Sequence, residues 1–280
     1  MKDRQYFKNF SIISISLWLA FFVAFSFIII ITVSFLQKDP DQLISWHFTF
    51  ENYLQLLDPL YLRILLDSFL LAATVTLICF LLGFPFAYFM LQLSPRQRAT
   101  IILLLIIPFW TSSLIRSYAL IAILKAHGVI NSLLITIGLI DTPLPILFSN
   151  TAVLIGLVYN LLPFMIFPIY AKLERLNPQL IHAARDLGAN QWTIITKIIM
   201  PLALPGIMAG VFLVFLPAMT LFYIPDLLGG ADSILLGNLI QFQFVTAYNW
   251  PGGAATSILL TFMVVMLIML NLCITPKQSS

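Results

Sequence analysis

About six apolar stretches, each long enough to cross a lipid bilayer, dominate this chain. A membrane-spanning helix needs about 20 mainly apolar residues, because the hydrocarbon core of a bilayer is about 30 Å thick. Of the 280 residues, 61% are hydrophobic and only 9% are charged. Soluble domains carry about 25% charged residues, so the chain is predicted to be an all-α membrane protein with one membrane domain over residues 1–280. We place the spans near Phe10–Leu36, Leu65–Gln92, Thr100–Leu124, Pro145–Tyr170, Ile198–Ile224 and Ala254–Ile274.

The first apolar stretch follows the basic segment Met1–Lys8, an order that is also typical of a secretory signal peptide. The stretch is longer than the apolar part of a signal peptide, and no small-residue cleavage pattern follows it. We therefore interpret it as a retained first span.

Basic residues indicate how the spans are oriented, because loops on the cytoplasmic side carry an excess of lysine and arginine. One set of segments contains most of them, namely Lys2, Arg4, Lys8, Arg96, Arg98, Lys172, Arg175, Arg185, Lys197 and Lys277. The opposite set holds Lys38, Arg63 and Lys125 together with most of the acidic residues. This asymmetry predicts a multi-pass membrane protein with both termini in the cytoplasm. The topology accounts for the net charge of +3, so no nucleic-acid partner is expected.

One cytoplasmic segment, between the fourth and fifth spans, is amphipathic instead of apolar. Asn177 is suited to cap a helix N-terminus, Pro178 to occupy the first helical position, and Gly188 to end the helix in a left-handed conformation. Leu180, Ile181, Ala184 and Leu187 would share one face of this helix, opposite Gln179, His182 and Asp186. A short rigid helix with polar ends is the design expected of a docking element, although an ordinary loop helix would show the same local signals.

The fixed spacing of Ala183-Ala184, Gly188, Ile198 and Pro201 resembles the EAA loop of permease subunits in bacterial ATP-binding-cassette (ABC) importers. The resemblance implies a location in a bacterial inner membrane and the type I ABC importer permease fold, with a coupling helix in a loop of about residues 172–201. In that family the coupling helix fits a groove on the cytoplasmic ATPase subunit. The residues implied in ATPase coupling are His182, Ala183, Ala184, Asp186, Leu187 and Gly188. His182 replaces the leading glutamate of the family, which leaves open whether the ATPase contact is weakened or matched by a compensating partner.

The chain shows no sequence motif for catalysis or cofactor binding. It has no Gly-x-x-x-x-Gly-Lys phosphate loop, and His47, His127 and His182 lie on separate segments without metal-ligand spacing. We therefore predict that the chain is not an enzyme and binds no metal or cofactor. Energy for uphill transport would have to come from a partner subunit or from an ion gradient.

Acidic and aromatic residues near the outer end of the fifth span predict a pathway for a cation. Asp226 follows Phe222 and Tyr223, and Asp232 lies a few residues further on. A carboxylate beside aromatic rings attracts an organic cation by charge and by cation–π contact. The predicted pathway residues are Asp226, Tyr223, Phe222 and Asp232, with Trp110 and Phe109 beside Pro108 as a further aromatic wall. Aromatic residues at span ends also serve as interface anchors, and aspartates in loops are often simply solvated.

A second resemblance concerns the transported solute. The runs Leu216–Met219, Phe222-Tyr223, Asp226-Leu227, Gly229–Ala231 and Asn249–Pro251 resemble the B-type permease subunits of spermidine/putrescine importers. The resemblance implies a polyamine importer that also contains a second homologous permease, two copies of an ABC ATPase subunit and a periplasmic polyamine-binding protein. The preference between spermidine and putrescine stays open. So do an ABC permease for another solute, an ion-coupled secondary transporter and a scaffold subunit without a pathway.

Overall fold

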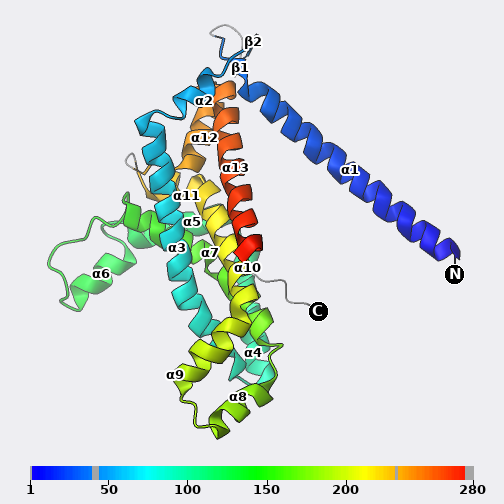
Figure 1. Ribbon diagram of the computed structural model, residues 1–280. Helices are drawn as coiled ribbons and strands as arrows, with labels where there is room; N and C mark the ends of the chain where they lie inside the picture. Colours follow the sequence, from blue (N-terminus) through cyan, green and yellow to red (C-terminus); the bar gives the residue numbers. More distant parts are fainter. Residues whose placement is uncertain (1, 40–43, 231–232, 275–280) are drawn as a thin grey trace. The chain divides into compact units, whose positions relative to one another are not determined.

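The computed structural model of the chain describes residues 2–39, 44–230 and 233–274, and these residues are mainly α-helical (Figure 1). The chain divides into two compact units. One unit combines Met1–Arg63 with Leu239–Ser280, and the other comprises Ile64–Asn238. Two helices, α3 (Pro59–Leu91) and α12 (Leu236–Val245), run across the boundaries between the units.

The first unit pairs the two ends of the chain. It contains α1 (Lys2–Ser34), strands β1 (Leu36–Gln37) and β2 (Ser45–Phe48), α2 (Glu51–Gln55) and α13 (Trp250–Ile274). The strands form an antiparallel pair, and both α1 and α2 pack against α13. Buried Asn52 donates hydrogen bonds to the carbonyl oxygens of Ser34 (2.9 Å) and Leu36 (2.8 Å), which joins α2 to the end of α1. Asn52 thereby pairs the carbonyl of Ser34, which α1 leaves open at its C-terminus, and that of Leu36 in β1.

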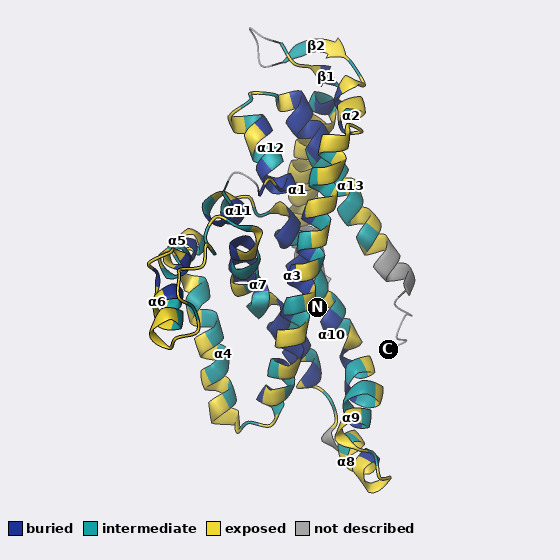
Figure 2. Ribbon diagram, turned by 90° about the vertical axis from the view of Figure 1, so that its left-hand side faces the viewer, coloured by how far each residue is buried: buried dark blue, intermediate teal, exposed yellow. Residues whose placement is uncertain are grey.

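The second unit is built around two long helices, α7 (Asn150–Leu173) and α10 (Met200–Thr220), which pack against each other. The unit also contains α4 (Pro95–Trp110), α5 (Ser113–Leu124), α6 (Val129–Thr136), α8 (Pro178–Asp186), α9 (Gln191–Ile194), the π-helical turn η1 (Ile195–Ile199) and α11 (Tyr223–Leu228). Both α7 and α10 contain many buried residues (Figure 2).

Small residues allow α10 to approach α7 closely. Gly206 and Gly210 lie one turn apart on the buried face of α10. A Cβ atom at Gly206 would lie 2.7 Å from the carbonyl oxygen of Pro168, and one at Gly210 would lie 2.7 Å from the sulfur of Met165. Paired small residues with this spacing are typical of membrane helices whose backbones touch. The contact therefore has no room for larger side chains.

The structure contains six helical stretches that are long and apolar enough to cross a membrane, within the residues it describes. They are Ile12–Ser34, Pro59–Leu91, Ser113–Thr136, Asn150–Leu173, Gln191–Thr220 and Trp250–Met269. Five of them overlap the predicted spans for most of their length, which confirms the predicted fold class.

The third span differs from the prediction of one continuous helix over Thr100–Leu124. The backbone is extended at Thr111 (ψ 145°) and Ser112 (ψ 134°), so α4 ends and α5 begins there. The side chain and the N–H of Thr111 both hydrogen-bond to the carbonyl of Pro108, which closes the last turn of α4. The apolar pattern does not reveal this break, because both sides of it are apolar.

Prolines within the spans do not break the helices. α3 continues through Pro85, and α7 continues through Pro163 and Pro168. The irregular turn lies instead in η1, where the N–H of Met200 donates to the carbonyl of Ile195. Pro201 follows this turn and has no N–H to donate, so the regular ladder of hydrogen bonds is interrupted beside it.

We expect Gly206→Ala to destabilise the second unit by about 1–3 kcal/mol, because the added methyl group would press on the backbone of α7. The midpoint of thermal unfolding in detergent would measure the change. Ala209→Val adds carbon to an exposed position of the same helix and serves as the control. Equal midpoints for Gly206→Ala and the unaltered protein would contradict the close approach.

Candidate functional site

The polar helix α8 begins and ends as the sequence predicts. The side chain of Asn177 accepts a hydrogen bond from the backbone N–H of Gln179 (3.0 Å), and Pro178 occupies the first turn. At the other end Gly188 has φ +79°, and the N–H of Ala189 donates to the carbonyl of Ala184 (3.0 Å). A left-handed residue with this pattern of bonds is a common helix C-terminus, and glycine adopts it without strain.

The four apolar side chains that were predicted to share one face of this helix differ in how far they are buried. Ala184 is buried and Ile181 is half-buried, but Leu180 is 48% exposed and Leu187 is 88% exposed. Leu187 follows the last helical residue, so the helical periodicity no longer fixes its direction. The segment thus presents two exposed leucines beside the polar side chains of His182 and Asp186.

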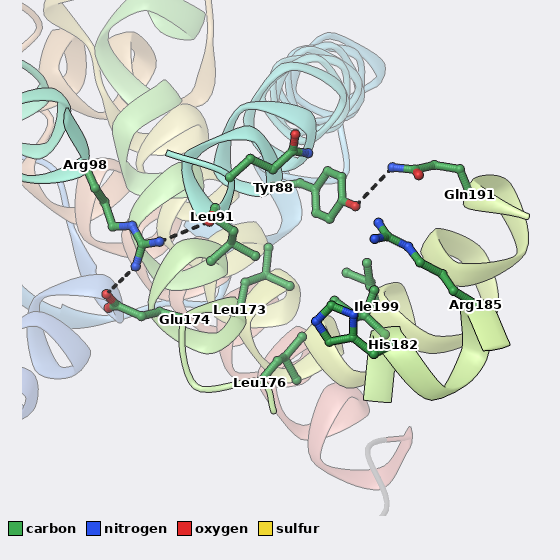
Figure 3. A pocket seen from close by; sticks show the side chains of 12 residues that line it. Tyr88, Leu91, Arg98, Leu173, Glu174, Leu176, His182, Arg185, Gln191 and Ile199 are labelled. Carbon is green, nitrogen blue, oxygen red and sulfur yellow. Dashed lines mark hydrogen bonds and ion pairs between the residues drawn. The ribbon is translucent and has the colours of Figure 1, made fainter. Parts of the chain in front are cut away.

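A cavity of about 630 Å³ lies between α8 and the ends of α3 and α7 (Figure 3). His182 and Arg185 line it from α8, and Tyr88 lines it from α3. The amide of Gln191 donates to the Tyr88 hydroxyl (3.3 Å) across its rim. Sequence reasoning missed Tyr88 and Gln191, since no local signal connects residues so far apart in the chain.

One ion pair lies at the edge of the same cavity. Arg98 contacts Glu174 (3.3 Å) and donates to the carbonyl of Leu91 (3.1 Å), while the Tyr170 hydroxyl donates to Glu174 (2.7 Å). Two groups therefore stabilise the Glu174 carboxylate, and Arg98 joins the start of α4 to the ends of α3 and α7. The pair is partly exposed, so its net contribution to stability is small.

The predicted pathway residues Phe222, Tyr223 and Asp226 lie together at α11. The Tyr223 hydroxyl lies 2.6 Å from the Ser113 hydroxyl, which itself donates to the Asn160 side chain (2.9 Å). Because the single Ser113 hydrogen points to Asn160, Tyr223 is the donor in its bond to Ser113. This chain of bonds joins α11, α5 and α7 and fixes the position of the Tyr223 ring.

Asp226 is exposed and is held by Asn238, whose side-chain amide donates to the carboxylate. The same amide donates to the carbonyl of Phe222 (3.0 Å). Asn238 is buried, and its side-chain oxygen has no hydrogen-bond partner among the described residues. A carboxylate has about four acceptor positions, so Asp226 keeps capacity for a further donor. Sequence reasoning also missed the positioning residues Ser113, Asn160 and Asn238.

The aromatic wall predicted beside Pro108 has a different environment. The Phe109 ring contacts Phe164 (5.0 Å between centroids), and the guanidinium carbon of Arg116 lies 5.7 Å from the Phe109 centroid. Trp110 is 85% exposed. Asp232, the other predicted pathway residue, lies outside the described residues. Within the described ranges, no cluster of His, Cys, Asp and Glu side chains could hold a metal ion.

We expect Ser113→Ala to weaken the attachment of α11 by about 1 kcal/mol, because Tyr223 and Asn160 would lose their shared partner. Thermal unfolding in detergent would measure this loss. The matched control is Ser112→Ala, since the Ser112 side chain makes no capping bond and is exposed. If both variants unfolded at the same temperature, the bridging role of Ser113 would be refuted.

Comparison with known proteins covers nearly the whole chain. The family described as "Binding-protein-dependent transport system inner membrane component" matches residues 6–275. The relatives include proteins named "Spermidine/putrescine transport system permease protein PotB". The relative from Escherichia coli (strain K12) is 50% identical over 250 residues, which cover 89% of this chain and 91% of the relative. The relative from Salmonella typhimurium (strain LT2) is 47% identical over 270 residues, covering 96% and 94%. The relative from Haemophilus influenzae is 44% identical over 262 residues, covering 94% and 92%.

Solved structures with the same fold come from more distant proteins. A chain of a bacterial ABC transporter that imports the acidic polysaccharide alginate superposes with a TM-score of 0.79 at 16% identity, over 99% of this chain and 98% of the other. A second structure, of the alginate transporter with a pentasaccharide-bound periplasmic protein, gives 0.77 at 15% identity over 96% and 93%. At these identities the similarity concerns the fold.

Proposed function

Because the chain belongs to the family of binding-protein-dependent transport system inner membrane components, we propose that it is a permease subunit of a polyamine importer. Spermidine and putrescine would cross the membrane along a pathway that this chain forms with a second, homologous permease. The identity of 44–50% to spermidine/putrescine permeases, over most of both chains, is the observation that carries this proposal. The whole chain, residues 1–280, would act as one permease domain.

Asp226 and Tyr223 form the part of the pathway that would meet the solute. Polyamines carry protonated amines, which bind carboxylates by charge-assisted hydrogen bonds and aromatic faces by cation–π contact. Asp226 is exposed and has acceptor capacity beyond its bond to Asn238, while Ser113 holds the Tyr223 ring beside it. Phe222 is 42% exposed and contacts Tyr223 edge to face. Phe109, Trp110 and Asp232 would belong to more distant parts of the same pathway.

The energy for transport would come from a separate ATPase subunit, present in two copies, since the chain itself carries no phosphate loop. A periplasmic polyamine-binding protein would deliver the solute to the outer segment from Asp226 to Trp250. Both termini and α8 would then lie in the cytoplasm, as the lysine and arginine asymmetry predicts.

Helix α8 would transmit the motion of the ATPase to the spans. It is short and capped at both ends, and it is joined directly to α7 and, through α9 and η1, to α10. The exposed Leu187 would enter a groove of the ATPase, with Ala183 permitting close approach and His182 and Asp186 at the margins. A lever of this kind works only if its ends are rigid, which makes the left-handed turn at Gly188 decisive.

To test the function, labelled spermidine uptake would be measured in cells that lack their own polyamine importers and express the complete gene set. Uptake that requires both this chain and a catalytically intact ATPase supports the proposal. Assembly of the complex without uptake of spermidine or putrescine would overturn the polyamine assignment and leave the family membership unchanged.

We expect Asp226→Asn to lower spermidine uptake at limiting substrate by about tenfold, since one charge-assisted bond is worth about 1.5–3 kcal/mol. Asp141→Asn, at an exposed position in the loop before α7, is the matched control. Co-purification of the ATPase subunit should be unchanged in both variants. Equal uptake by Asp226→Asn and the control would remove Asp226 from the pathway.

We expect Gly188→Val to abolish transport while membrane insertion persists, because a β-branched residue is strained at φ +79°. Gly138→Val is a close control: Gly138 has φ +71°, and at both glycines nothing lies within 4 Å of a Cβ atom. The two substitutions therefore impose the same backbone strain at different places. Transport by Gly188→Val at the level of Gly138→Val would contradict the coupling role of α8.

A further inference from the structure

The cavity beside α8 has a position and a lining that the transport function does not explain. Leu91 is the last residue of α3, Leu173 is the last of α7, and Gln191 is the first of the span Gln191–Thr220. All three line the cavity. The ends of three candidate spans thus meet here, and in the proposed topology this is the cytoplasmic end of those spans.

The lining combines an aliphatic surface with a polar rim. Its apolar members are Leu91, Leu173, Leu176, Ile181 and Ile199. Its volume of about 630 Å³ lies in the range typical of sites for organic ligands, about 300–1,000 Å³. An empty cavity of this size beside α8 would not help α8 to transmit motion, whereas an amphiphilic ligand could fill the cavity.

The charges on the rim favour an anion. Glu174 is already bound by Arg98 and by the Tyr170 hydroxyl. The side chain of Arg185 makes no hydrogen bond or ion pair in the described part of the chain, and Figure 3 shows its guanidinium extending toward the Tyr88 hydroxyl and the Gln191 amide. A guanidinium beside neutral hydrogen-bonding groups is well suited to a phosphate ester.

His182 contributes to the same balance. It lines the cavity from α8. Its imidazole can donate a hydrogen bond to a phosphate held by Arg185. His182 therefore adds a hydrogen-bond donor, and no negative charge, to the rim of the cavity.

We propose that the cavity binds an anionic phospholipid, with the phosphodiester at Arg185 and the start of an acyl chain against the leucines and isoleucines. Basic pockets between membrane helices bind the head groups of anionic lipids in this way. The aliphatic lining argues for a lipid over free phosphate, which has no apolar part to bury. The lipid would fill the space between α8 and the spans to which α8 is joined. This proposal does not depend on which solute is transported.

Native mass spectrometry of the complete transporter, released from nanodiscs, would test the proposal. The nanodiscs would contain phosphatidylcholine with or without phosphatidylglycerol. We expect phosphatidylglycerol to be retained by the unaltered complex, and its retention to fall about tenfold in Arg185→Gln, as expected for loss of one charge-assisted bond. His182→Glu should lower retention in the same direction. Arg175→Gln removes an exposed charge that does not line the cavity and should retain the lipid.

Three outcomes would overturn the proposal. Equal retention by Arg185→Gln and Arg175→Gln would show that the lipid does not bind at Arg185. Displacement of phosphatidylglycerol by excess inorganic phosphate would assign the site to a free anion. Loss of the ATPase subunit from Arg185→Gln, with lipid retention unchanged, would assign Arg185 to the protein interface. None of these measurements uses polyamine uptake. A result that overturned the lipid proposal would therefore leave the proposed transport function untouched.

Discussion

The close approach of α10 to α7 is the contact on which the second unit depends. In a lipid environment the apolar side chains of two helices gain little from leaving the solvent, so close packing has to hold the helices together. Gly206 and Gly210 bring the backbones together, and Met165 and Ile169 of α7 are completely buried beside them. The segments with proposed functional roles are attached to this pair: α8 is the next helix after α7, and α11 is the next helix after α10.

Local signals in the sequence were sufficient to predict α8. The Asn177 cap, Pro178 in the first turn and the left-handed Gly188 all act within a few residues, and the structure places each as expected. The six spans could be predicted for a similar reason, since length and apolar character alone decide whether a helix can cross the bilayer. The break at Thr111 escaped prediction because it separates two apolar helices, and the π-turn escaped because nothing apart from Pro201 marks it.

Contacts between distant residues could not be predicted from the sequence. Ser113, Asn160 and Tyr223 are polar residues on three separate helices, and only the packed structure brings them into one chain of hydrogen bonds. Asp226 was identified from its aromatic neighbours, but its partner Asn238 lies beyond a stretch of glycine and loop residues. Helical periodicity did not indicate how exposed Leu187 is, because Leu187 follows the last residue of the helix.

The π-turn in η1 has a consequence for how α8 is oriented. A widened turn of this kind is equivalent to one extra residue inserted into an α-helix, and each residue of an α-helix turns the chain by about 100°. Loss of one residue from Ile195–Ile199 would restore the regular helix and rotate everything on its N-terminal side by about that angle relative to α10. The number of residues in this turn therefore sets the rotation of the segment that contains α8 about the axis of α10. Substitutions that keep this number would leave the rotation unchanged.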